Sequence, residues 1–121
     1  MAAPPTTARS VGKGQHRLSI RIDLASGARI GPGKVALLEA IARTGSISAA
    51  GRALRMSYRR AWELVEDLNR GLGTPVVSTV AGGAGGGGAR LTPAGEAIVT
   101  RYRAIEAATM EAAREHLAAI G

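Results

Sequence analysis

The residues of this chain best suited to bind a ligand are two adjacent arginines at the start of a predicted helix. Arg59 and Arg60 lie in the first turn of a helix expected over residues 58–72, on the face opposite its apolar stripe. An arginine can donate two parallel hydrogen bonds to guanine O6 and N7, and the hydroxyls of Ser57 and Tyr58 can reach phosphates. This group of side chains predicts contact with a nucleic acid.

The other polar residues give little support to a catalytic or metal site. The chain has no Cys, and His16 and His116 stand alone, so neither a thiolate site nor a Ser-His-Asp arrangement can be argued. Glu63, Glu66 and Asp67 are expected to form a solvated helix face rather than a metal site. We therefore expect no enzymatic activity, no cofactor and no metal.

The distribution of charge also favours a polyanionic partner. Sixteen Lys and Arg against nine Asp and Glu give a formal net charge of +7. Residues 1–60 hold eleven basic and two acidic side chains, whereas residues 61–121 hold five basic and seven acidic ones. A basic half is typical of a nucleic-acid-binding face. A solubilising surface, or a genome rich in Arg and Ala codons, is the alternative explanation.

The sequence contains neither a secretion signal nor a segment that could span a membrane. Residues 1–14 lack an apolar stretch, and no run approaches the roughly 18 apolar residues of a membrane helix. The absence of Cys fits a reducing compartment. We expect a soluble cytoplasmic protein that does not contact a membrane.

The elements expected before these arginines are a tail, a strand and a helix. Residues 1–16 lack periodicity and predict a disordered basic tail. Residues 18–24 alternate between apolar and polar, which predicts a half-buried strand, and residues 28–30 are expected to pair back on it. A helix then follows residues 31–33 and ends at Gly45. Its inward face is predicted to consist of Val35, Leu38, Ile41 and Ala42.

Two further helices are expected to form a helix-turn-helix. Ser46 is placed to cap a short helix over residues 47–54, and Ser57 is placed to cap the longer helix over residues 58–72. Trp62 is expected at the edge of the core. The inward residues of the short helix are predicted to be Ile47, Ala50, Ala53 and Leu54. Those of the longer helix are predicted to be Tyr58, Ala61, Val65, Leu68 and Leu72.

The glycine-rich run at residues 82–88 has three interpretations. A linker is disfavoured because only one helix follows it, and a phosphate-binding loop should end in Gly-Lys-Ser/Thr and lead into a helix. The favoured interpretation is a hairpin whose tip is a wing. Backbone without side chains can approach DNA closely there, and Arg90 adds charge.

The last helix, residues 93–121, is predicted to mediate dimerisation. Thr92 and Pro93 form a strong helix start. The 28 residues from Pro93 to Ile120 span about 42 Å as a helix, which exceeds the size of the domain that such a helix could cover. The predicted dimer seam consists of Ile98, Tyr102, Ile105, Thr109, Ala112 and Leu117. The alternative is a helix that buries this stripe within its own domain.

The predicted order of elements is that of a winged helix-turn-helix domain, mainly α with a small β component, over residues 17–92. A plain three-helix bundle with a basic face is the alternative. Several segments resemble the DNA-binding domain of the molybdate-responsive regulator ModE family. These are residues 45–48, 57–58 with 61–62, 68–69 and, most distinctively, 82–92. The helix-turn-helix also resembles that of LysR-type regulators. The ModE resemblance covers roughly residues 18–120.

The resemblance implies a transcriptional regulator that binds operator DNA as a homodimer joined through its long helices. Full-length ModE proteins continue into molybdate-binding domains, and this chain ends at Gly121, so molybdate is not an expected ligand of this chain. The expected recognition helix is 57–72 and the expected wing is 81–90. The predicted contacts to double-stranded DNA are Ser46, Ser48, Arg52, Ser57, Tyr58, Arg59, Arg60, Gly85, Gly86, Gly87 and Arg90. A non-specific nucleoid-type DNA binder and a protein-interaction module built on the same scaffold are the alternatives.

Overall fold

The computed structural model describes residues 16–83 and 86–121. The predicted tail up to residue 15, and Gly85 at the predicted wing tip, lie outside the described residues. The described elements are β1 (Ile22–Asp23), β2 (Arg29–Ile30), α1 (Pro32–Thr44), α2 (Ile47–Ala53), α3 (Tyr58–Leu72), β3 (Val77–Gly83), β4 (Gly86–Leu91) and α4 (Pro93–Ile120). This is the predicted mainly α winged helix-turn-helix with a long C-terminal helix.

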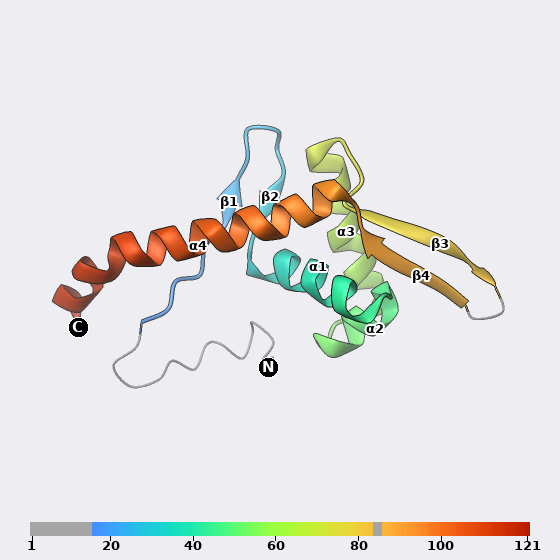
Figure 1. The fold of residues 1–121 in the computed structure, drawn as a ribbon, viewed down its shortest axis with the longest axis horizontal. Helices are drawn as coiled ribbons and strands as arrows, with labels where there is room; N and C mark the ends of the chain where they lie inside the picture. Colours follow the sequence, from blue (N-terminus) through green and yellow to red (C-terminus); the bar gives the residue numbers. More distant parts are fainter. Residues whose placement is uncertain (1–15, 84–85) are drawn as a thin grey trace.

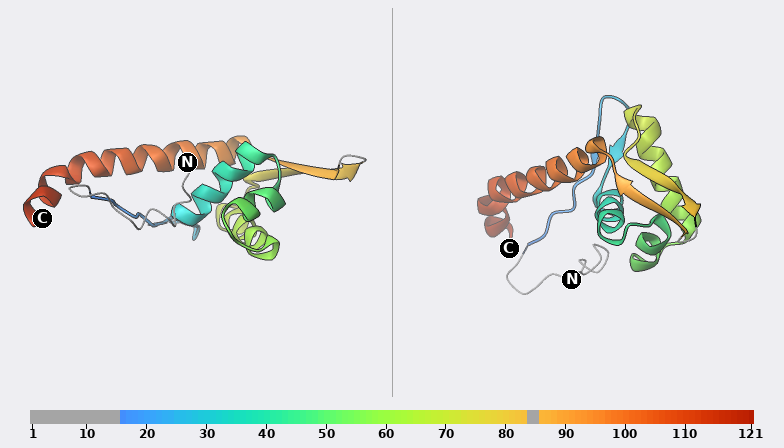
Figure 2. Two further views of the ribbon diagram at one scale, coloured as in Figure 1. Left: turned by 90° about the horizontal axis from the view of Figure 1, so that it is seen from below. Right: turned by 45° about the vertical axis from the view of Figure 1, so that its right-hand side comes forward.

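Three helices, α1 to α3, form the body of the molecule, and two long elements leave it in opposite directions. Figure 1 shows the antiparallel β3–β4 hairpin projecting as an arm from one side, while α4 runs away on the other. The same arrangement is seen from below in Figure 2. The core lies between α1, α3 and the start of β3. Its fully buried side chains include Leu37, Leu38, Ile41, Val65, Leu68 and Val76.

The helix boundaries follow the predicted capping residues. The side-chain oxygens of Ser46, Ser57 and Thr92 each accept a hydrogen bond from the backbone N–H three residues later, at 3.0 to 3.1 Å. Gly45 and Gly73 end α1 and α3 in the left-handed conformation, with φ of 74° and 72°. A Cβ disfavours this conformation, so glycine at these two positions stops each helix.

The strands differ from the prediction in length. β1 covers two residues rather than 18–24, although burial alternates along the whole of 18–24 as expected. β1 is short because its partner strand is short. The chain passes from β2 into the helix that begins at Pro32, so among the described residues no strand lies opposite residues 18–21. In contrast, β3 and β4 pair further into the glycine-rich run than expected, as far as Gly83 and Gly86.

Three predicted inward positions and one predicted seam residue are also corrected. Ala42, Ala53 and Tyr58 are exposed, because α1, α2 and α3 each turn a neighbouring face to the core. Ala36, Leu37 and Ala40 of α1 and Leu64 of α3 are buried although they were absent from the predicted inward faces. The fourth correction concerns Tyr102, which was predicted on an exposed dimer seam. Only 2% of its surface is exposed, so it is a core residue of its own chain.

The first turn of α4 packs closely against Val76, the residue before β3, and this contact leads to a prediction about stability. A Cβ built on Gly95 would lie 2.1 Å from the carbonyl oxygen of Val76, whereas one on Gly33 of α1 meets nothing within 4 Å. Gly95→Ala is expected to lower the free energy of unfolding by about 1–3 kcal/mol, because backbone must move to admit the methyl group. Gly33→Ala should leave it unchanged or raise it by up to about 1 kcal/mol. Urea denaturation of both variants checks this, and equal effects would contradict the close packing.

The buried hydroxyl of Tyr102 predicts that part of the stability of the fold is lost at alkaline pH. Its hydroxyl donates a hydrogen bond to the carbonyl oxygen of Ile20 at 2.6 Å, which ties the N-terminal segment to α4. Burial, assisted by the Glu106 carboxylate, raises the pKa of Tyr102 above its ordinary value of 10.0. Because the folded state holds this proton more tightly, the contribution is complete below pH 10 and is lost as the pH rises through the folded-state pKa.

We expect Tyr102→Phe to remove this part of the alkaline loss of stability, while Tyr58→Phe, at an exposed tyrosine, retains it. Denaturation curves between pH 8 and 11 measure the difference. An identical alkaline decrease in the native protein and in Tyr102→Phe would show that this tyrosine does not contribute.

Candidate nucleic-acid interface

Helices α2 and α3 cross at close range through a glycine. A Cβ on Gly51 would lie 3.4 Å from the Cβ of Ala61, which is itself completely buried. The Met56 amide donates to the Gly51 carbonyl oxygen at 2.9 Å, and Arg55 turns the chain with φ of 59°. These contacts fix the angle between the two helices and hold the N-terminus of α3 at the surface.

The first turn of α3 brings three of the predicted DNA contacts together. The side chains of Arg59 and Arg60 are 89% and 57% exposed, and both form ion pairs with Glu63. Tyr58 is 57% exposed and meets the half-buried Trp62 edge to face, with ring centroids 6.2 Å apart. This turn therefore presents two guanidinium groups and a phenol hydroxyl to solvent side by side.

The other predicted polar contacts, on α2 and at the two helix caps, also lie near the surface, and each already makes a hydrogen bond within the chain. Arg52 donates a hydrogen bond to the Ser48 hydroxyl oxygen at 2.9 Å, one helical turn away. Ser46 and Ser57 use their side-chain oxygens as helix caps. A serine hydroxyl that accepts a hydrogen bond keeps its own hydrogen, so both serines can still donate to a phosphate.

A groove of about 240 Å³ connects the helix-turn-helix with the wing. Val80 on its β3 wall is 63% exposed. Val80 and Thr79 could not be assigned to the interface from the sequence, because β-branched residues indicate a strand but not the surface that the strand faces. The groove is lined by Ser46, Ile47, Ser48, Tyr58, Trp62, Thr79, Val80, Gly88 and Ala89.

The base of the wing is anchored to the turn between α1 and α2. The Ala89 amide donates to the Gly45 carbonyl oxygen at 2.9 Å. Arg90 lies next to this anchor and is exposed, as expected. Gly86 and Gly87 lie in the paired backbone of β4. The anchor places the β3–β4 arm beside the first turns of α2 and α3, so wing and recognition helix share one side of the molecule (Figure 1).

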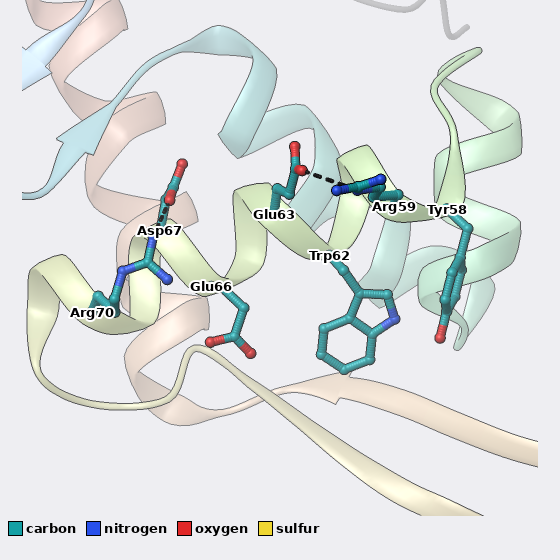
Figure 3. A pocket seen from close by; sticks show the side chains of 7 residues that line it. All are labelled: Tyr58, Arg59, Trp62, Glu63, Glu66, Asp67 and Arg70. Atoms are coloured by element: carbon teal, nitrogen blue, oxygen red, sulfur yellow. Dashed lines mark hydrogen bonds and ion pairs between the residues drawn. The ribbon is translucent and has the colours of Figure 1, made fainter.

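The later turns of α3 carry the acidic residues. Figure 3 shows Glu66, Asp67 and Arg70 along one shallow groove, with Trp62 and Tyr58 at its other end. Asp67 is paired with Arg70 at the surface. Within residues 16–83 and 86–121, no group of three potential metal ligands is found. The positive charge of α3 is therefore concentrated at its N-terminal turn.

The first half of α4 packs on its own domain, and the second half extends beyond it. Arg103 donates two hydrogen bonds to the Glu39 carboxylate of α1, at 2.9 and 2.6 Å, and these bonds raise the pKa of Arg103. Ile105 is 42% exposed and Ile120 is 82% exposed. Of the remaining predicted seam residues, Ile98, Thr109 and Leu117 are half-buried and Ala112 is exposed. No described helix is long and apolar enough to cross a membrane.

Known proteins with a similar sequence or structure contain the same helix-turn-helix fold. The family described as "Bacterial regulatory helix-turn-helix protein, lysR family" matches residues 33–96, from α1 into the first turn of α4. Two solved structures have the same fold. A crystal structure of a CbnR_DBD–DNA complex aligns with 71% of this chain and 94% of that one, at 25% identity and a TM-score of 0.54. Full-length LysG from Corynebacterium glutamicum aligns with 72% of this chain and 28% of that one, at 24% identity and a TM-score of 0.53.

The predicted resemblance to ModE is confirmed by curated relatives. The molybdenum-pterin-binding protein MopB of Rhodobacter capsulatus is 56% identical over 82 residues, which cover 68% of this chain and 30% of MopB. The molybdenum transport protein ModE of Azotobacter vinelandii is 41% identical over 90 residues, which cover 74% of this chain and 33% of ModE. The chain thus spans about a third of the length of the relatives that it matches. Since the family match extends over more than half of the sequence, this chain belongs to the bacterial LysR-type family of regulatory helix-turn-helix proteins.

Proposed function

We propose that this protein regulates transcription by binding operator DNA as a homodimer. The N-terminal turn of α3 enters the major groove, and the β3–β4 wing lies against the neighbouring phosphate backbone. The observation that carries the proposal is the exposed pair Arg59 and Arg60 at the start of α3, beside the groove that leads to the wing. Entry of this end of the recognition helix into the major groove is the usual geometry of the motif.

The groups in and next to the groove form two sets, one suited to base edges and one suited to phosphates. Arginine side chains on α3 are suited to base edges, because their forked donors match guanine. Hydroxyls at the α2 and α3 caps and the backbone of β4 are suited to phosphates, which set the register of the protein on the duplex. The exposed Val80 and the ring of Tyr58 offer apolar surface between these two sets.

The dimer is supported by the exposed apolar residues of α4. Ile105 near the middle of this helix and Ile120 at its end are both exposed, and a second copy would cover the same apolar residues on both chains. Such a pair would present two recognition helices to successive major grooves, about 34–36 Å apart.

A competition experiment tests the sequence specificity. A labelled duplex selected by the protein should remain bound when about a hundredfold excess of random duplex is added, because specific sites are typically preferred by about 10³-fold or more. Displacement by an equal amount of random duplex would favour a non-specific DNA-binding protein. Absence of binding to any duplex would favour a protein-interaction module.

A further inference from the structure

Both exposed arginines of the recognition turn converge on one carboxylate. Arg59 Nε lies 3.5 Å from Glu63 Oε2, and Arg60 NH1 lies 3.5 Å from Glu63 Oε1. The two arginines point in directions about 100° apart on the helix, and Glu63 reaches both because it stands four and three residues further on. Figure 3 shows the Glu63 carboxylate directed at the Arg59 guanidinium.

The atoms used by Glu63 leave the base-reading edge of Arg59 available. The carboxylate faces Nε, so the two terminal nitrogens of Arg59 remain directed to solvent. A bidentate contact to guanine O6 and N7 needs two donors held in the plane of the base, whereas a phosphate accepts a guanidinium in many orientations. An ion pair that narrows the range of orientations of the Arg59 guanidinium therefore favours base recognition over phosphate binding.

The negative charge of Glu63 also favours operator DNA over random DNA. Its carboxylate offsets one of the two positive charges on the recognition turn, and it repels the phosphates of any duplex that approaches. Random DNA, which is held by phosphate contacts, meets this repulsion without the compensating base contacts. Operator DNA meets the same repulsion, but base contacts from the preoriented arginines offset it.

We propose that Glu63 is a positioning residue that raises the sequence specificity of Arg59 and Arg60. This inference rests on the DNA-binding function proposed above. It predicts that Glu63→Gln binds random DNA more tightly than the native protein, with a steeper dependence on salt. Discrimination between a selected site and random DNA should fall by roughly threefold or more, the combined effect expected from two exposed ion pairs.

Glu66→Gln provides the matched control. Glu66 lies on the same helix, is exposed, and forms no ion pair among the described residues. The Glu66→Gln substitution removes the same formal charge as Glu63→Gln but leaves the ion pairs of Arg59 and Arg60 intact. The discrimination of this variant between selected and random duplexes should stay close to that of the native protein.

Fluorescence anisotropy on a selected and a random duplex, at several salt concentrations, measures these ratios. The proposal is supported if discrimination falls only in Glu63→Gln, and if the operator positions that lose specificity are those that also lose it in Arg59→Ala or Arg60→Ala. Unchanged discrimination in Glu63→Gln, or an equal fall in Glu66→Gln, overturns it and leaves the proposed function intact. Absence of discrimination in the native protein overturns both.

Discussion

Ile105→Asp is expected to give a folded protein whose affinity for its operator is about a hundredfold or more below that of the native chain. Ile105 is 42% exposed on α4, so a charge there does not disturb the core of its own domain. In a dimer the same position faces the partner helix, and a buried carboxylate without a partner would separate the subunits. Loss of the second half-site removes an avidity of about 10²–10⁴.

Sedimentation equilibrium, circular dichroism and operator titration together measure this outcome. Ala104→Asp is the control, since Ala104 is exposed and points about 100° away from Ile105 on the same helix. It should retain both dimer and operator affinity. A single native species near 12.3 kDa at high micromolar concentration would rule out the dimer. Unfolding of Ile105→Asp would show instead that the stripe is buried within one chain.

Replacing both Arg59 and Arg60 with alanine is expected to lower the preference for the operator over random DNA by roughly a hundredfold or more. A bidentate contact to guanine contributes about 1–3 kcal/mol of discrimination, so the loss of two reaches roughly a hundredfold or more. The single variants separate the roles. A base contact should relax one operator position when removed, whereas a phosphate contact should weaken all sequences alike and lower the salt slope by about one.

Arg70→Ala is the control for this pair. Arg70 is also exposed on α3, but it lies at the far end of the helix and pairs with Asp67. Its loss should leave the sequence preference unchanged. If Arg59→Ala and Arg60→Ala both keep the native affinity and preference, the first turn of α3 is not the reading surface.

Helix boundaries could be predicted from the sequence because they depend on local chemistry. Ser46, Ser57 and Thr92 cap their helices through their own hydroxyls, and Gly45 and Gly73 stop helices through their own backbone freedom. These effects need no partner from elsewhere in the chain. The cluster of Tyr58, Arg59 and Arg60 could be predicted for the same reason, since all three lie in one helical turn.

Features that depend on distant segments could not be predicted in this way. The length of β1 is set by where the helix after its partner strand begins. Tyr102 is buried by packing against the core, and its hydroxyl is bound by the carbonyl group of Ile20, 82 residues away in the sequence. Helical periodicity places Tyr102 in an apolar stripe but does not say which surface covers it. The groove wall at Thr79 and Val80 depends on the Ala89 to Gly45 hydrogen bond, which sets the angle of the wing.

Selection of binding sites from a random pool of duplex DNA, with the purified protein, tests the central claim most directly. We expect the selected sequences to share a motif of two related half-sites with two-fold symmetry, spaced by about one helical turn or a multiple of it. That result would match two recognition turns carried by a symmetric dimer. Recovery of DNA without any shared motif would contradict the assignment of this chain as a sequence-specific regulator.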